Sequence, residues 1–227
     1  MSPAEYCIRV PAQDAIGERI WIRAEGNFHV DYNATVELSR TLPALGSLKG
    51  LGLHHMPGEV VQYLLPSLYC PSDRFLPFVL DEFQGTEGGT RIEAIREWIA
   101  NQFVYEPGSS TSATTALDSF LERRGICRDY AHILITMARA SEIPARYVSV
   151  YAPHVKPQDF HAVAEVFLAN PDGEGGTWQL VDATGMAAPD EIVKIGVGRD
   201  AADVSFLTSF GECRFADKEI TVRQTAG

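Results

Sequence analysis

The stretch of sequence that decides the fold is Gly125-Ile126-Cys127-Arg128-Asp129-Tyr130-Ala131-His132. It opens a segment, from Cys127 to about Ser141, in which apolar residues occupy most of the circumference of a helix. A helix with this pattern is buried at the centre of a domain. The first backbone N–H groups of a helix have no helical partner and carry the positive end of its dipole, so a cysteine there forms a thiolate readily. The sequence therefore predicts a central helix with a reactive thiol at its N-terminus.

A histidine and an aspartate downstream complete the set of groups that such a thiol needs. His161 and Asp182 lie on two strand-like segments, 161–168 and 177–182, joined by a glycine-rich turn. This pattern indicates an antiparallel hairpin, which makes the two side chains neighbours. A buried carboxylate is costly without a partner, and an imidazole N–H is a suitable one that leaves the other ring nitrogen for the thiol. We therefore predict that Cys127, His161 and Asp182 are nucleophile, base and orienting acid.

Structural roles are the alternative for the same residues. A lone cysteine is often a small buried hydrophobic residue, and His161 could be a hydrogen-bonded histidine of the core. The catalytic interpretation is favoured for Cys127 by its neighbours. The charged Arg128 and Asp129 follow it, and Gly125 precedes it where a helix commonly ends in the left-handed conformation.

The segments before the cysteine helix change from a β pattern to a helical one. Apolar and polar residues alternate strictly over 28–38, which predicts a half-buried strand, with 19–24 as its partner across a turn. Residues 60–65 are a further strand candidate. Helices are predicted over 72–83, from the capping-box pair Thr90 and Glu93 onward, and over 113–123.

The segments after the cysteine helix return to a β pattern. Strands are predicted over 145–151 and 214–223, in addition to the hairpin. Helices followed by an antiparallel sheet indicate the α+β class. We divide the chain into a β-rich N-terminal region, 1–65, and a catalytic domain, 66–227.

Composition and charge argue against several classes of protein. A net charge of −11 disfavours a surface for nucleic acid or for an anionic membrane. No apolar run approaches the roughly 18 residues that span a bilayer, and no signal-peptide pattern opens the chain. The four cysteines are scattered and His54-His55 have no second ligand pair nearby, so neither a disulfide framework nor a metal site is expected. We expect a cytoplasmic protein without a cofactor; the sequence leaves a homo-oligomer open.

Linked motifs across the chain resemble the bacterial transglutaminase-like family. In chain order they are Gly125–His132, Ile143–Ser149, Phe160–Glu165, Asp182–Thr184 and Gly198–Val204. The likeness runs over roughly residues 60–210. It implies the papain-like fold of transglutaminases, in which a helical part with a central cysteine helix packs on an antiparallel sheet. It also implies that Cys127 matches the nucleophile, His161 the base and Asp182 the orienting acid.

The chain departs from the family pattern at three places. Many relatives carry an aromatic residue where this chain has Val163, and a proline where it has Ala183. Both changes leave the catalytic groups in place but alter the surroundings of the acyl group. Family members also usually carry an N-terminal β-domain, for which the first 60 or so residues are short.

Acyl transfer also needs donors for the oxyanion that forms on the carbonyl. The backbone N–H of Cys127 is one, and Tyr105 or Trp98 is a candidate for a side-chain donor, although each of these residue types is more often simply part of a core. His132 lies five residues after Cys127, about 500° around the helix, and therefore points away from the thiol. Arg199 and Asp203, together with Asp200, are expected to form a structural ion-pair loop.

The predicted function is acyl transfer from a peptide or carboxamide through a thioester on Cys127. Water as the second substrate gives a protease, peptidase or amidase, and this interpretation is favoured because no protein-crosslinking module is evident. No calcium-loop pattern is present either, so a calcium-dependent enzyme is not expected. An amine would make the same site a protein-glutamine transamidase. Two further alternatives are an acyltransferase with an acyl-donor pocket and a catalytically silent scaffold. The expected partner is a peptide, a protein or a small amide, with no nucleic acid and no membrane.

Overall fold

The structure, a computed structural model, describes residues 5–224. Its strands are β1 (Tyr6–Val10), β2 (Arg19–Arg23), β3 (Val104–Tyr105), β4 (Arg124–Gly125), β5 (Ala145–Tyr151), β6 (His161–Ala169), β7 (Gly176–Val181) and β8 (Val193–Gly198). Its α-helices are α1 (Gly58–Val61), α2 (Leu76–Glu82), α3 (Gly88–Gln102), α4 (Ala116–Glu122) and α5 (Cys127–Ala140). Short 3-10 helices are η1 (Gln13–Ala15), η2 (Leu45–Ser47), η3 (Leu53–His55), η4 (Gln62–Leu64), η5 (Ser72–Arg74) and η6 (Ala201–Val204).

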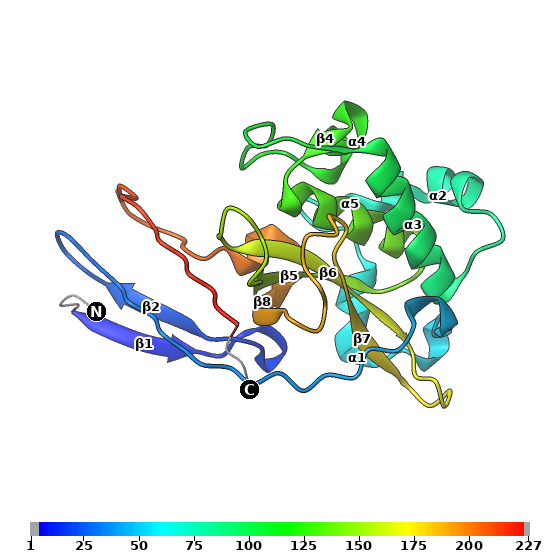
Figure 1. The fold of residues 1–227 in the computed structure, drawn as a ribbon, viewed down its shortest axis with the longest axis horizontal. Helices are drawn as coiled ribbons and strands as arrows, with labels where there is room; N and C mark the ends of the chain where they lie inside the picture. Colours follow the sequence, from blue (N-terminus) through cyan, green and yellow to red (C-terminus); the bar gives the residue numbers. More distant parts are fainter. Residues whose placement is uncertain (1–4, 225–227) are drawn as a thin grey trace.

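An antiparallel sheet of four strands, in the order β7-β6-β5-β8, forms the centre of the body. Helix α5 packs on one face of this sheet, and α2, α3 and α4 surround α5 on its other side (Figure 1). Apolar side chains of the helices and the sheet meet in one core cluster, which includes Ile95, Leu134 and Val166. Helices gathered on one side of an antiparallel sheet confirm the predicted α+β class.

The cysteine helix is the most central helix, as predicted. Every residue of α5 from Asp129 to Ala140 is buried. Apolar side chains around most of its circumference face the sheet on one side and the other helices on the other. Within residues 5–224, no helix combines the length and the apolar character needed to cross a membrane.

Strand β6 lies inside the sheet and is buried from His161 to Ala169. Successive side chains point to opposite faces of a sheet, so Ala164 belongs to the cluster under α5 and Val163 to a second apolar cluster on the other face. Because both faces are covered, the charged residue of this strand, Glu165, has no access to water and needs partners inside the protein.

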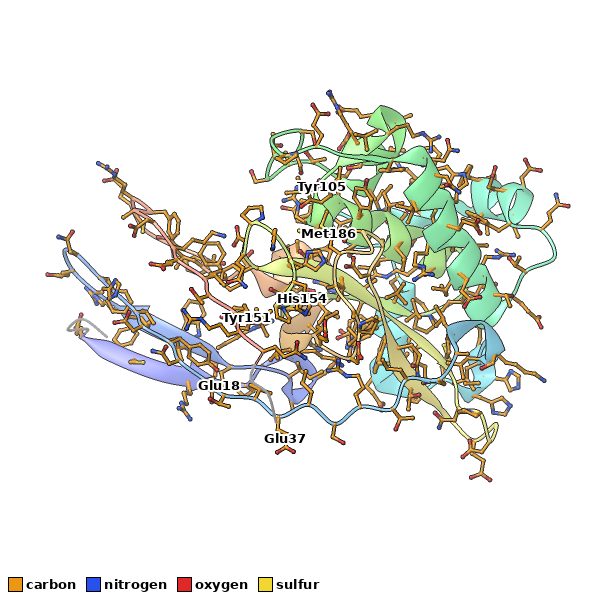
Figure 2. All side chains as sticks on the ribbon, viewed as in Figure 1. Glu18, Glu37, Tyr105, Tyr151, His154 and Met186 are labelled. Atoms are coloured by element: carbon orange, nitrogen blue, oxygen red, sulfur yellow. The ribbon has the colours of Figure 1, made fainter. Side chains whose placement is uncertain are left out.

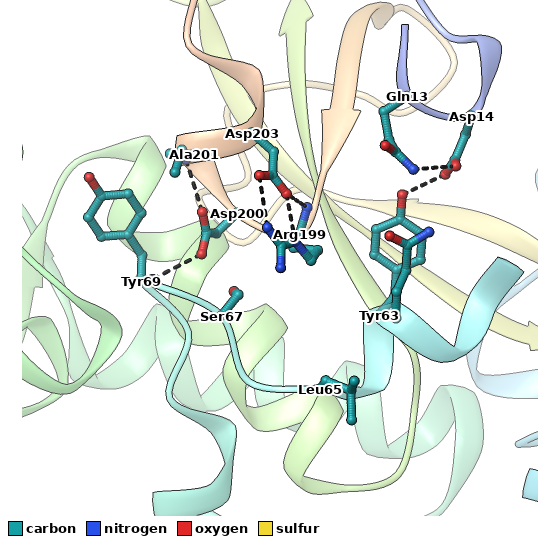
Figure 3. Close-up of polar contacts among 12 residues, drawn as sticks. Gln13, Asp14, Tyr63, Leu65, Ser67, Tyr69, Arg199, Asp200, Ala201 and Asp203 are labelled. Carbon is teal, nitrogen blue, oxygen red and sulfur yellow. Dashed lines mark hydrogen bonds and ion pairs between the residues drawn. The ribbon is translucent and has the colours of Figure 1, made fainter.

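Two cations hold Glu165 inside the protein. The Arg146 guanidinium on β5 donates to one carboxylate oxygen from Nε at 2.8 Å and from Nη2 at 2.6 Å. Lys194 of β8 pairs with the other oxygen. Arg146 also pairs with Asp14 of η1 at 2.6 Å, and Asp14 accepts a hydrogen bond from the Tyr63 hydroxyl at 2.7 Å (Figure 3). This network joins three strands of the sheet to the N-terminal segment.

The predicted strand over 28–38 is absent. Residues 24–44 contain neither a helix nor a strand. Strand β2 pairs instead with β1, with Ile8 opposite Trp21. A strand needs a neighbouring backbone for its hydrogen bonds, and residues 30–38 find no such backbone partner within the described chain.

Two other strand predictions are wrong. Residues 60–65 belong to α1 and η4, where Val60 and Tyr63 are buried three positions apart, as on one face of a helix. Residues 214–223 have no strand structure. The fourth strand of the sheet is β8, which contains Gly196 and Gly198 and therefore lacks a strong strand pattern.

Residues 45–65 pack against the helical part of the body. Leu48 is in the core cluster, and its carbonyl accepts the N–H of Gly89 at 2.9 Å. The Glu93 carboxylate accepts the N–H of Gly46 at 3.0 Å, and the residues that cap α3 are Glu87 and Thr90 rather than Thr90 and Glu93. The boundary at residue 65 between two regions stays a prediction.

Candidate active site

Cys127 is the first residue of α5, and its position is fixed by the turn that precedes it. The Asp129 carboxylate accepts hydrogen bonds from the N–H of Ile126 and from the hydroxyl of Ser110, both at 2.9 Å. Gly125 allows this, because a Cβ on it would lie 2.6 Å from the Asp129 Cβ. The prediction that Gly125 is the left-handed end of the preceding helix is wrong. Arg123, with a φ of 56°, is that residue, and Gly125 lies in β4.

His161 and Asp182 are brought together by the predicted hairpin. His161 is the first residue of β6, Asp182 directly follows β7, and both side chains are buried. The His161 Nε2 and an Asp182 carboxylate oxygen are 3.0 Å apart. Asp182 also accepts three hydrogen bonds at 2.8 Å, from the N–H and hydroxyl of Thr184 and from the N–H of Ala187. The carboxylate is therefore held in one orientation, with a charge that faces the imidazole.

The electrostatics of these two residues favour an imidazolium–carboxylate pair. Burial lowers the pKa of His161, but the hydrogen bonds and charges of Asp182 and Cys127 outweigh it and raise that pKa to about 9. For Asp182, burial raises the pKa, but His161 and Thr184 outweigh it, so that the net pKa is lowered. Since Nε2 faces Asp182, Nδ1 is the ring nitrogen available to the thiol. His161 is therefore hydrogen-bonded to Asp182, and its pKa also responds to the nearby Cys127 thiol.

Asp182→Asn is expected to lower the pKa of His161 from its value of about 9, because burial remains while the countercharge is lost. A His pKa that is higher in the folded protein than the ordinary 6.5 stabilises the fold below about pH 6.5, and this stabilisation is lost as the pH rises through about 9. Imidazole ¹⁵N NMR should therefore show a midpoint near 9 for the wild type and a lower one for the variant. The stability difference between the two proteins should also shrink across that window. Identical midpoints would contradict the role given to Asp182.

The two candidates for a side-chain oxyanion donor lie in different places. The pKa of the Tyr105 hydroxyl is raised by burial and by the charge of Cys127, which lies close to it. Trp98 packs instead among the aromatic side chains of Phe78 and Phe120, with the Arg123 guanidinium 4.6 Å from its ring. The structure therefore brings Tyr105, and not Trp98, to the thiol.

The loop after β8 has the structural role expected of it. Arg199 and Asp203 form an ion pair at 3.0 Å, and the buried Asp200 accepts the N–H of Tyr69 at 2.9 Å (Figure 3). The N–H of Ala201 donates to Nε2 of His132 at 3.2 Å. Burial lowers the pKa of His132 well below its usual value, which keeps the ring neutral and able to accept this bond. These contacts fasten the loop to α5 and leave His132 out of the chemistry.

A pocket of about 440 Å³ borders Asp182 and is lined by Met186 and His154, but not by Cys127 or His161. In Figure 2, Tyr105, Met186 and His154 follow one another down the viewed face of the body.

Sequence reasoning missed three residues that shape the site. Asp129 anchors the start of α5, Thr184 orients Asp182, and the Arg128 guanidinium donates to the hydroxyl of Ser110 at 3.1 Å and to the carbonyl of Thr111. A carboxylate at the third position of a helix is a known capping signal, so Asp129 could have been assigned from the sequence. The role of Arg128 depends on a loop that lies far away in the chain.

Comparison with known proteins agrees with this geometry. A family model described as the transglutaminase-like superfamily matches residues 80–183, which include Cys127, His161 and Asp182. The structure resembles a candidate cysteine protease from Cytophaga hutchinsonii, with a TM-score of 0.74 and 31% identity, covering 89% of this chain and 69% of that one.

Uncharacterized mycobacterial proteins are also similar. One from Mycobacterium leprae is 26% identical over 171 residues, and one from Mycobacterium tuberculosis H37Rv is 32% identical over 126 residues. The alignments cover 72% and 50% of this chain, and the chain spans 60% and 40% of the lengths of these relatives. The family model and the similarity to the Cytophaga protein place this chain in the transglutaminase-like superfamily.

Proposed function

We propose that the protein is a cysteine hydrolase that cleaves peptide or carboxamide bonds by acyl transfer to Cys127. The observation that carries the proposal is the contact of 3.0 Å between His161 Nε2 and Asp182, combined with the interaction of His161 with the thiol at the start of α5. This arrangement has a nucleophile, a base and a fixed orienting acid in the order that acyl transfer needs.

In the proposed reaction, His161 already holds the proton of the Cys127 thiol as an imidazolium, and the Cys127 thiolate forms a bond to the substrate carbonyl carbon, whose oxygen becomes the oxyanion. The imidazolium then gives this proton to the leaving amine as the C–N bond breaks, which leaves a thioester on Cys127. Water attacks the thioester, His161 accepts its proton, and the C–S bond breaks to release a carboxylic acid and restore the thiol. Asp182 stabilises the imidazolium throughout.

Two donors are available for the oxyanion of the tetrahedral intermediate. The N–H of Cys127 lies in the first turn of α5, where backbone N–H groups have no helical partner. The Tyr105 hydroxyl, whose pKa is raised by the nearby Cys127, is the proposed second donor. Removal of one such donor typically costs about 10²-fold or more in kcat.

Hydrolysis is favoured over transamidation by the similarity to a candidate cysteine protease, which includes most of this chain. The substrate that we propose is a peptide or a protein. Transamidation by the same thioester is the competing outcome, because only the second nucleophile differs.

The test is to incubate the protein with a library of peptides in H₂¹⁸O that also contains methylamine, with Cys127→Ala as the control. The proposal predicts peptide acids that carry ¹⁸O in the wild-type reaction only, and an acyl adduct on Cys127 after acid quenching. Methylamides in place of acids would make the protein a transamidase. The absence of any product, together with no selective labelling of Cys127 by a chloroacetamide, would favour a silent scaffold.

A further inference from the structure

The N-terminal residues 5–44 and the C-terminal residues 205–224 form an extension that we call the arm. Figure 1 shows the β1–β2 hairpin and the C-terminal segment of the arm on one side of the body, away from the helices, whereas the chain after β2 runs on along the body to α1. Large apolar side chains are exposed along it, and such patches on a soluble protein mark interaction sites. They are Tyr6, Ile8, Ile20, Trp21, Val30, Tyr32, Val36, Leu38, Leu42, Phe206, Leu207, Phe210 and Phe215.

The surface area of the chain is too large for a compact monomer. A folded monomer of 24.9 kDa exposes about 10,000 Å², whereas this chain exposes 13528 Å². The excess of roughly 3,000 Å² on one copy is more than the about 1,000–2,500 Å² that each partner of a permanent dimer buries, which is half of the total of about 2,000–5,000 Å². The arm therefore offers enough area for a stable interface.

The backbone of the arm also lacks partners. Strands β1 and β2 form a sheet of two strands, and within residues 5–224 neither outer edge is paired. A hairpin of this kind is marginally stable in water unless further strands join it. Residues 30–43 form no backbone–backbone hydrogen bond within the described chain, although the sequence over 28–38 alternates as a strand does. One copy thus carries both an open sheet edge and a segment suited to fill one.

We propose that the arm binds the arm of a second copy of this chain, with residues 28–38 of each copy adding a strand to the β1–β2 hairpin of the other. The exchange is reciprocal, so one two-fold axis fills one open edge in each copy and closes the assembly. Arg40 opposes the pairing of residues 28–38 with the hairpin of their own chain. Its guanidinium donates to the carbonyls of Pro189 and Ile192, which holds the chain just after this segment on the body.

The proposed interface between the two arms would extend to β6, the strand that begins with His161. Phe206 of the arm stacks on Phe160, with ring centroids 5.2 Å apart, and Phe160 directly precedes His161. Lys218 of the arm pairs with Asp159. A partner bound to the arm would therefore lie next to the segment before β6. The proposal does not depend on catalysis, because its test measures mass and hydrogen exchange.

The test is sedimentation equilibrium of the purified full chain over a wide range of concentrations. The wild type is expected at twice the chain mass of 24.9 kDa. The double variant Tyr32→Lys and Val36→Lys, which changes side chains that are 72% and 51% exposed, is expected at the monomer mass. The matched control is Leu80→Lys and Leu121→Lys on α2 and α4, where exposure is 59% and 70%, and it should remain a dimer.

Hydrogen exchange locates the interface independently of the variants. The backbone amides of residues 30–38 should be protected in the wild type at high concentration and exchange rapidly in the arm variant. A wild type that is monomeric at all concentrations would overturn the proposal. The arm would then have to bind a partner other than a second copy of this chain. A dimer in which these amides exchange as fast as in a monomer would also overturn it.

Discussion

Replacement of Cys127 by alanine is expected to lower kcat by about 10⁴-fold or more while the protein stays folded. The effect is large because His161 and Asp182 act through the thiol, so the loss of the nucleophile removes the covalent route as a whole. The substitution removes one sulfur atom from a partly buried position and leaves the Asp129 anchor of α5 intact. The measurement is steady-state hydrolysis of the best peptide from the library, with thermal unfolding to verify the fold.

Cys70 provides the matched control for this variant. It is fully buried, and burial raises the pKa of its thiol to about 12, so it stays protonated and unreactive. Cys70→Ala should therefore retain wild-type kcat. If Cys127→Ala kept activity within about tenfold of the wild type, the covalent mechanism would be wrong.

Replacement of Glu165 by glutamine is expected to destabilise the fold by about 3–5 kcal/mol, the usual cost of removing one partner from a buried ion pair. The Glu165 side chain is fully buried and Arg146 is 3% exposed, so the variant leaves a buried guanidinium with fewer countercharges. Asp14 and the partial exposure of Lys194 moderate the loss. Urea unfolding, followed by circular dichroism, measures the difference.

An exposed ion pair provides the control for this second prediction. Glu122 pairs with Arg124 at 3.0 Å on the surface, where both side chains are about half exposed. Glu122→Gln should leave the unfolding midpoint nearly unchanged, because water replaces the lost partner. Equal shifts of the unfolding midpoint in the two variants would mean that burial does not determine how much Glu165 contributes to the free energy of unfolding.

The sequence was sufficient to predict the centre of the fold. The cysteine helix was predicted from Cys127 to about Ser141 and runs to Ala140, and the hairpin that holds His161 and Asp182 forms as expected. These elements are long, apolar and bounded by clear turns, so their local pattern and their burial agree. The same agreement accounts for the positions of Cys127, His161 and Asp182, each of which lies at the end of a well-defined element, whereas their catalytic roles stay a prediction.

The remaining errors have a common physical cause, which is that local pattern does not specify a partner. Residues 28–38 alternate like a strand, but 30–38 form no backbone–backbone hydrogen bond within the described chain. Residues 60–65 are apolar enough for either a strand or a short helix. Strand β8 was missed because Gly196 weakens its pattern. Gly196 lies opposite Gly17. A Cβ on Gly17 would come within 1.7 Å of the Ile195 carbonyl oxygen, so the two backbones approach closely here.

The close approach of Gly125 to Asp129 bears on how this nucleophile could be transplanted into a designed scaffold. A graft of the cysteine alone would leave the first helical turn without its carboxylate anchor, and a side chain at position 125 would push that anchor away from the N–H of Ile126. The smallest portable unit is therefore the five-residue block from Gly125 to Asp129, taken as a whole. Design libraries that vary the glycine while they keep the cysteine should yield folded proteins with a displaced thiol.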